Sequence, residues 1–396
     1  MKRRDFIKQS SLASSLLMVP SFVKAFDGAL SAKYGHKKLV IIQLSGGNDG
    51  LNTIIPYRND WYYKNRPSIG VELSQVLKLT DDLGFHKSLQ PLQKLYDQGY
   101  LSIINNVGYP NPDRSHFRST DIWHTASASN QYWQNGWIGR FLDAHANASH
   151  GAIEVNESLS LLLKGAKRNG IATTDARRLF RLAQEPYFKN VVAHHKDQHL
   201  SEHNLGYLYK TMINAESSAK YIYEKTRLYS GQASYPDTGF AKQLKTIGQF
   251  INSGLDTKVY YASLSGFDTH ANQNQKQSRL LSQYSEGIAA FVKDLKSQDS
   301  FKDTLILTFS EFGRRVKQNA ANGTDHGSAN NVFVIGEHLK TSGFYNQLAS
   351  LEDLDANGDL KFEIDFRTIY ATILKQWMHV NDEAILNAKF SALNFI

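Results

Sequence analysis

Three segments of the chain end in side chains of the kind that bind metal ions. In each segment a short apolar run with the character of a strand comes first, and carboxylates or imidazoles follow it directly. The chain contains no cysteine, so a transition-metal site would have to use these oxygen and nitrogen ligands. The candidate ligands are Asp49, Asp268, His270, Glu311, Asp325 and His326.

The apolar runs predict buried strands, and helical periodicity fills the segments between several of them. In open α/β sheets ligands bind beyond the carboxyl ends of the strands, so we expect the candidate ligands to meet there. The alternation of strand and helix predicts a doubly wound, mostly parallel sheet with helices on both faces. The predicted strands are residues 39–44, 101–107, 259–265, 304–309 and 331–335, and two clear helices are 240–253 and 278–297.

Two of the candidate carboxylates also have a purely structural interpretation. Asp49 lies in the glycine-rich turn after the first strand, where it could bind a metal or cap the next element. Glu311 could form an ion pair with Arg314, one helical turn further along the chain. From the sequence both alternatives stay open.

Ser115 follows the strand predicted at 101–107 and precedes a helix predicted at 117–126. It could be an ordinary N-cap, or a nucleophile at the positive end of that helix. A metal-free hydrolase in which Ser115 works with His116 or His124 is disfavoured, because the chain has no G-x-S-x-G turn around this serine.

Residues 1–25, MKRRDFIKQSSLASSLLMVPSFVKA, resemble a twin-arginine export signal. Arg3 and Arg4 are followed by an aromatic residue, an aliphatic residue and a lysine, although Lys2 replaces the more usual Ser or Thr. The run up to Val23 is too short and too rich in serine to span a bilayer. We therefore predict a mature start near Phe26, a periplasmic or secreted location, and the twin-arginine export machinery as a partner.

The charge of the chain argues against a nucleic-acid partner. Of the formal net charge of +8, the signal segment supplies half, since it holds five basic residues and one acidic residue. The remaining net charge of about +4 over some 370 residues is too small for polyanion binding. No later segment is long and apolar enough for a membrane helix, so we expect no stable membrane anchor.

The mature chain, residues 26–396, is predicted to form a single α/β domain with a helical insertion at about 154–230. Strand signals fade in that stretch and long amphipathic runs replace them. His195, His199 and His203 share a helix face there, but their charged neighbours favour a solvated face over a metal site.

Several motifs occur in one order over nearly the whole mature chain: LSGGNDGLNTIIPY, PNPDRSHFRSTDIWHTA, GFDTHANQ, TFSEFGRR, GTDHGSANNVFVIG and DFRTIYATIL. In them the chain resembles the secreted bacterial family called domain of unknown function 1501, which is grouped with the alkaline phosphatase and sulfatase superfamily. The resemblance implies an alkaline-phosphatase-like fold and the hydrolysis of a phosphate or sulfate ester at a metal site. The substrate would be an anionic small molecule or a glycan ester.

The resemblance also implies roles for individual residues. Asp268, His270 and His326 would hold one metal, and Asp49, Glu311 and Ser115 the other. Phe312 stands where the superfamily has a histidine ligand, and Asp325 or Asn48 could compensate for it. The first set suits zinc and the second, without imidazole, suits magnesium, manganese or calcium. Ser115 or a metal-bound water would attack, with Arg114 or Arg314 stabilising the developing charge.

A hypothesis of a different class is a non-catalytic secreted protein that keeps the fold and an incomplete metal site. It would bind a glycan or a partner through the aromatic region from Trp133 to Trp137. Phe312 in place of a histidine favours this alternative, and the three converging strand ends favour the hydrolase. The number of bound ions distinguishes them, because a catalytic pair needs two.

Overall fold

The structure is a computed structural model that describes residues 35–194, 204–229, 231 and 233–396. The chain divides into two units, residues 1–37 and 38–396, and the second contains the elements below. The predicted export signal and the histidines at 195, 199 and 203 lie outside the described residues. Within the described ranges no helix has the length and apolar character needed to cross a membrane.

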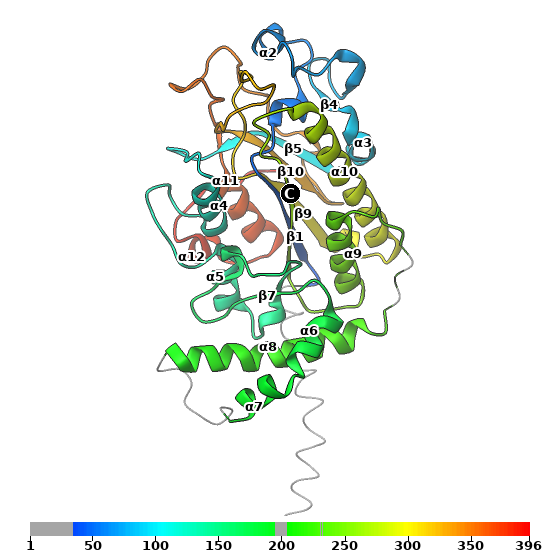
Figure 1. The fold of residues 1–396 in the computed structure, drawn as a ribbon, viewed down its shortest axis with the longest axis vertical. Helices are drawn as coiled ribbons and strands as arrows, with labels where there is room; N and C mark the ends of the chain where they lie inside the picture. Colours follow the sequence, from blue (N-terminus) through cyan, green and yellow to red (C-terminus); the bar gives the residue numbers. More distant parts are fainter. Residues whose placement is uncertain (1–34, 195–203, 230, 232) are drawn as a thin grey trace, which may run out of the picture. The chain divides into compact units, whose positions relative to one another are not determined.

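The second unit is built around a sheet in which nine strands are found among the described residues (Figure 1). The strand order is β11-β5-β10-β9-β1-β8-β6-β7, with β12 also paired to β5. The strands are β1 (Lys38–Ser45), β5 (Leu101–Gly108), β6 (Ala152–Glu154), β7 (Ile171–Ala172), β8 (Val259–Ser265), β9 (Thr304–Phe309), β10 (Asn330–Ile335), β11 (Gly343–Phe344) and β12 (Ile364–Asp365).

The sheet is mostly parallel, as the sequence predicted. β1 runs parallel to β8 and β9, and β8 runs parallel to β6. Within the described part of the sheet β10 alone runs against its neighbours, β9 and β5. The fold class is confirmed, and the five predicted strands agree with β1, β5, β8, β9 and β10 to within one residue at each end.

Helices cover both faces of this sheet (Figure 1). On one face lie α3 (Gln90–Asp97), α9 (Gly239–Asn252) and α10 (Gln273–Ser297), and on the other lie α4 (His116–Thr125), α5 (Trp137–His145), α11 (Phe366–Thr372) and α12 (Asp382–Leu386). A π-helical turn, Ile373–Trp377, continues α11. Asp365 caps α11 through a hydrogen bond to the backbone of Arg367, which explains why that helix begins where it does.

Two smaller regions flank the sheet. β2 (Ile54–Ile55), β3 (Val76–Lys78) and β4 (Gly84–His86) form a separate antiparallel sheet, next to α2 (Asp60–Asn65). Three helices, α6 (Ala176–Ala183), α7 (Pro186–His194) and α8 (Asn204–Thr226), lie within the stretch 154–230 in which the sequence predicted a helical insertion. The start of that stretch instead contains β7, which pairs with β6 in the central sheet.

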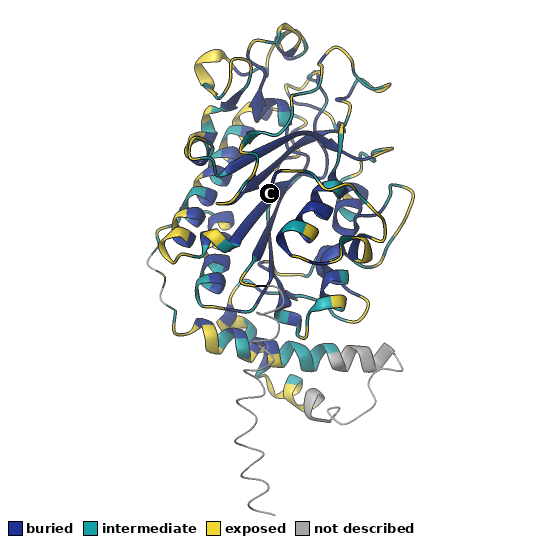
Figure 2. Cartoon of the chain, turned by 180° about the vertical axis from the view of Figure 1, so that it is seen from behind, coloured by how far each residue is buried: buried dark blue, intermediate teal, exposed yellow. Residues whose placement is uncertain are grey.

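The central strands are buried along their length (Figure 2). β5, β9 and β10 are buried at every residue, and β1 is buried up to its last residue, Ser45. Apolar side chains on strands of this kind pack against helices on both faces, which is why they read as continuous apolar runs. Polar residues begin where the strands end, and the site lies at that edge.

Candidate metal centre

Four loops meet at the carboxyl edge of the sheet, after β1, β5, β8 and β9. The register sets Ser45 opposite Ser265 in β8, so the loops after β1 and β8 leave the sheet at the same level. They then touch closely: a Cβ on Gly46 would lie 2.4 Å from the backbone nitrogen of Asp268. Gly46 also has a φ of +116°, which L side chains rarely adopt. A glycine is therefore required at this position to bring Asp268 to the edge.

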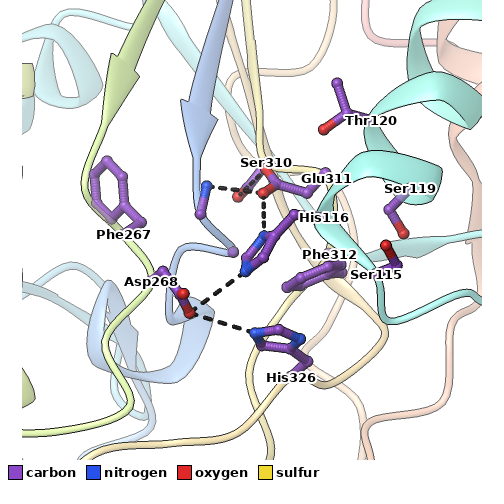
Figure 3. Close-up of polar contacts among 12 residues, drawn as sticks. Ser115, His116, Ser119, Thr120, Phe267, Asp268, Ser310, Glu311, Phe312 and His326 are labelled. Carbon is purple, nitrogen blue, oxygen red and sulfur yellow. Dashed lines mark hydrogen bonds and ion pairs between the residues drawn. The ribbon is translucent and has the colours of Figure 1, made fainter.

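Three histidines direct their Nε2 atoms at Asp268, and Figure 3 shows two of them, His116 and His326. The distances to Asp268 Oδ1 are 3.4 Å from His116, 3.3 Å from His326 and 3.0 Å from His270. His116 opens α4, His270 follows β8, and His326 lies between β9 and β10. We call Asp268 and these three histidines the His–Asp cluster.

The tautomer of each histidine in the cluster is fixed by an acceptor at Nδ1. Nδ1 of His116 lies 2.9 Å from Glu311 Oε1, and Nδ1 of His270 lies 3.1 Å from Asp325 Oδ1. Nδ1 of His326 lies 2.7 Å from the carbonyl oxygen of Arg114. Because these oxygens accept, each Nδ1 carries the proton, and the neutral ring then has its lone pair on Nε2.

The Nε2 lone pairs face one another without a donor between them. His270 Nε2 and His326 Nε2 lie 2.9 Å apart, a separation at which two lone pairs repel unless a cation lies between or beside them. His116 Nε2 is buried and has no hydrogen-bond partner. A proton on one of these rings, or a cation beside them, would relieve this repulsion.

A divalent metal ion would be such a cation. One ligand atom each from His116, Asp268 and His326 lie within 4.8 Å of one another. Three ligands of this type with an open fourth position are typical of catalytic zinc sites. The acceptors at Nδ1 correspond to the outer partners that orient metal-bound histidines in proteins.

The protonation states in the cluster suit such an ion. Partial burial would raise the pKa of Asp268, but the hydrogen bond and charge of Arg314 outweigh it and lower that pKa to about 2. Burial also lowers the pKa of His326, which favours its neutral form. The hydrogen bond to Glu311 raises the pKa of His116, so a proton competes with a metal for that ring.

Glu311 acts on the cluster through His116. It is buried and accepts hydrogen bonds from His116 Nδ1 and, at 2.8 Å, from the backbone nitrogen of Gly46. Gln43 Nε2 lies 3.3 Å from its other oxygen. The alternative ion pair between Glu311 and Arg314 is not found among the described residues.

Glu311 is contacted by a network of uncharged side chains, formed by Gln43, Tyr261 and His124. Gln43 Oε1 accepts from the hydroxyl of Tyr261 at 2.6 Å, which sets the amide so that its Nε2 donates toward Glu311. His124 Nε2 lies 3.2 Å from the same oxygen, and complete burial lowers the pKa of His124 to about 3. This histidine is therefore neutral and lies too deep to act as a base for Ser115.

Asp49 does not join the cluster. Its Oδ1 accepts from the backbone nitrogens of Leu51 and Asn52, so it caps the short 3-10 helix η1 (Gly50–Asn52). Its Oδ2 lies 2.6 Å from Nη1 of Arg66, and neither side chain is exposed. Of the two metal sets implied by the resemblance, the structure brings together Asp268, His270 and His326 but not Asp49, Glu311 and Ser115.

The two candidate arginines are engaged elsewhere. The Arg314 side chain is 0% exposed, and it donates to Asp268 and to the carbonyl oxygens of Gly46, Gly47, Phe267 and Thr324. It ties the loops of the edge together and has no surface to offer a substrate. Arg114, which is one-third exposed, pairs with the buried Asp359 and holds His326 with its carbonyl oxygen.

Ser115 occupies the N-cap position of α4 without making the usual bond. Its side chain forms no capping hydrogen bond, and the residue is exposed. Its backbone nitrogen donates to Asp113 Oδ1 at 2.7 Å. The hydroxyl therefore stands unengaged one residue before His116.

His116 is the member of the His–Asp cluster that the sequence interpretation did not include among its candidate ligands. Phe312 fills the position at which the resemblance implied a histidine, and its ring packs against His116 and His326 at centroid distances of 4.8 and 4.7 Å. The imidazole comes instead from α4, behind a different strand. The signal was available, because β5 ends at the same edge and the rule that selected the other ligands also applies to its loop.

Solved structures similar to this chain are enzymes or enzyme domains at low identity. They include the lipoteichoic acid synthase LtaP from Listeria monocytogenes, with 11% identity and a TM-score of 0.40 over 89% of this chain and 76% of that one. The PsFucS1 sulfatase from Pseudoalteromonas sp. gives 12% and 0.39 over 93% and 72%. The C-terminal periplasmic domain of EcEptC from Escherichia coli gives 11% and 0.41 over 90% and 88%. At these scores no activity can be transferred.

The sequence-level comparisons are of two kinds. No curated protein matches the chain. A family model described as protein of unknown function (DUF1501) matches residues 36–389, which is most of the chain. The chain therefore belongs to the DUF1501 family.

Proposed function

We propose that this chain is an exported metal-dependent hydrolase of a phosphate or sulfate ester. The observation that supports it most is the convergence of three imidazole Nε2 atoms on Asp268, with each ring oriented by an acceptor at Nδ1. Metal-binding histidines in proteins almost always have such an acceptor at their other ring nitrogen. Export through the twin-arginine route is part of the proposal and rests on residues 1–25.

His116, Asp268 and His326 would hold the ion, with His270 beside them. A divalent ion there would supply Lewis-acid polarisation of the ester oxygen. Zinc suits two imidazoles and a carboxylate, as the sequence predicted for the first of its two sets. Glu311 and the Arg114 carbonyl keep the imidazoles in position.

The remaining residues at the edge suit an anionic substrate. Asp268 and His270 are nearly half exposed, so a ligand can reach the cluster from solvent. Ser115 offers an unengaged hydroxyl next to His116, and we propose it as the nucleophile. Arg114, the residue before it, is one-third exposed but is already paired with Asp359. The substrate would be an anionic small molecule or a glycan ester.

The test combines metal content with hydrolysis. The exported protein is purified, its zinc and manganese are quantified, and it is assayed with 4-nitrophenyl phosphate and 4-nitrophenyl sulfate beside the His116→Ala and Asp268→Ala variants. We expect an ion in the wild type, its loss in both variants, and hydrolysis only when the ion is present. His338→Ala, which alters an exposed histidine outside the cluster, is the matched control.

A second candidate is a secreted binding protein that keeps one structural ion. Phe312 at a ligand position favours it, but its proposed surface is reduced, because Trp137 is fully buried and stacks on Tyr370 at 4.4 Å. A wild type that holds an ion and hydrolyses neither ester would favour this candidate. A wild type that takes up no ion after zinc and manganese are supplied would refute both metal-based functions.

A further inference from the structure

The surroundings of Asp49 bear on how many ions the site takes. This aspartate follows β1 at the same edge of the sheet as the His–Asp cluster, and the resemblance placed it in a second metal set. In the structure both of its oxygens are occupied. Oδ1 receives two backbone N–H groups at 3.1 and 3.4 Å, and Oδ2 receives Arg66 and the amide of Gln273. A metal would have to displace one of these donors.

The guanidinium of Arg66 is fixed by hydrogen bonds to four acceptors. Its Nε and Nη2 donate to the backbone carbonyls of Val316 and Arg315 at 2.9 and 2.8 Å. Its Nη1 donates at 2.6 Å both to Asp49 and to Asn52 Oδ1. Because the guanidinium is buried and its hydrogen bonds are directed at four acceptors, it cannot swing aside to admit an ion without leaving those acceptors unpaired.

The other members of the second set are no more available. Glu311 Oε1 already accepts from His116 Nδ1 and the Gly46 nitrogen. No contact between Asp49, Glu311 and Ser115 is found in the described ranges. A divalent ion next to Asp49 would also lie beside the fixed charge of Arg66, and like charges at that separation in a buried place repel strongly.

We propose that Arg66 is the permanent counter-cation of Asp49, so that this edge of the sheet takes one divalent ion, at the His–Asp cluster, and not two. The inference rests on the proposed function for the presence of the first ion. In this interpretation Asp49 has a structural role. Its ion pair with Arg66 joins the loop after β1 to the segment at residues 315–316. The chemistry at the edge must then proceed with a single ion.

The experiment counts ions by native mass spectrometry. The full chain is freed of metal with a chelator and saturated with zinc, and manganese is then added as a probe for an oxygen-rich second site. The wild type is compared with Asp49→Asn and His116→Ala. The asparagine keeps an acceptor for the two backbone N–H groups, but its amide nitrogen replaces the oxygen that meets Arg66 and Gln273, and it removes the charge that a second ion would need.

We expect one ion in the wild type and in Asp49→Asn, and none in His116→Ala. A second ion in the wild type that is missing from Asp49→Asn would overturn the inference and leave the proposed function intact. No ion in the wild type would overturn both. If Asp49→Asn fails to fold, the wild type still decides, because one ion after manganese is added supports the inference and two ions contradict it.

Discussion

Two aspartates at one edge of the sheet have opposite surroundings. Asp49 follows β1 and Asp268 follows β8, and these strands are neighbours. Asp49 is 0% exposed and meets the guanidinium of Arg66, whereas Asp268 is 48% exposed and meets three imidazole lone pairs. The first carboxylate has all the positive charge it needs from the chain itself. The second also meets Arg314, and in the proposed function it shares a metal ion with the imidazoles.

This difference shows what turns a strand-end carboxylate into a site. Position at the edge is common to both, and so is the residue type. The two carboxylates differ in the groups that contact them. Asp49 is paired with the guanidinium of Arg66, whereas Asp268 faces the Nε2 atoms of three imidazoles, which could bind a cation together with it. Arg314 also reaches Asp268, with Nη2 2.7 Å from Oδ1, the oxygen that the three imidazoles approach.

The largest expected effect is on stability, when the buried Asp49 loses its partner Arg66. In Arg66→Met the charge of Asp49 stays buried without compensation, and breaking such a pair costs about 3–5 kcal/mol of unfolding free energy. Denaturant unfolding measures it. Arg178→Met is the matched control, because Arg178 pairs with Glu157 in solvent and should change stability little. Equal losses in the two variants would contradict the distinction between the regions.

At the exposed Asp268, changes in the His–Asp cluster should instead alter the affinity for metal. His116→Ala removes a ligand and should weaken zinc binding by more than about 100-fold, which is the upper range for loss of an outer partner. Asp49→Asn should leave zinc affinity nearly unchanged. Calorimetric titration of chelator-treated protein measures both. Zinc at about 100 times its dissociation constant should stabilise the wild type by about 2.7 kcal/mol, and His116→Ala at that concentration far less.

Outer partners of the cluster should have graded effects. Glu311→Gln keeps an acceptor at His116 Nδ1 but removes its charge, and it should lower zinc affinity by about 10-fold, the lower end of the range for such partners. Asp325→Asn makes the same change at His270, which lies outside the group of three ligands within 4.8 Å. Its effect should be smaller. A larger loss from Asp325→Asn would show that His270 and not His116 is the ligand.

Much of the fold could be predicted from the sequence because the buried strands are continuous apolar runs. β1, β8 and β9 are recognisable in the sequence as such runs. The polar residues that follow them indicate the edge of the sheet at which Asp268, His270 and His326 meet. The direction of β10 could not be read, because an apolar run carries no information on whether its neighbours run with it or against it.

The environment of each candidate ligand was beyond the sequence for a physical reason. Arg66 reaches Asp49 only because the chain turns through α2 and places the guanidinium over carbonyls near residue 315, a long-range arrangement that no local pattern encodes. Arg314 looked like a partner for Glu311 at helical spacing, but no helix forms there in the described structure, and it binds the backbone of two other loops. His116 was hidden beside a serine that attracted the functional interpretation.

The smallest effect on stability, and the sharpest on chemistry, is expected at Ser115. An N-cap serine usually contributes about 1 kcal/mol through its side chain, but Ser115 makes no such bond, so Ser115→Ala should leave the unfolding free energy within about 0.5 kcal/mol of wild type. Zinc affinity should also be unchanged, because the hydroxyl has no contact with the cluster among the described residues. If Ser115 is the nucleophile, hydrolysis of 4-nitrophenyl esters is lost while both other properties persist. Retained hydrolysis would assign the attack to water and leave the metal centre as proposed, whereas a loss of zinc would place the hydroxyl among its ligands.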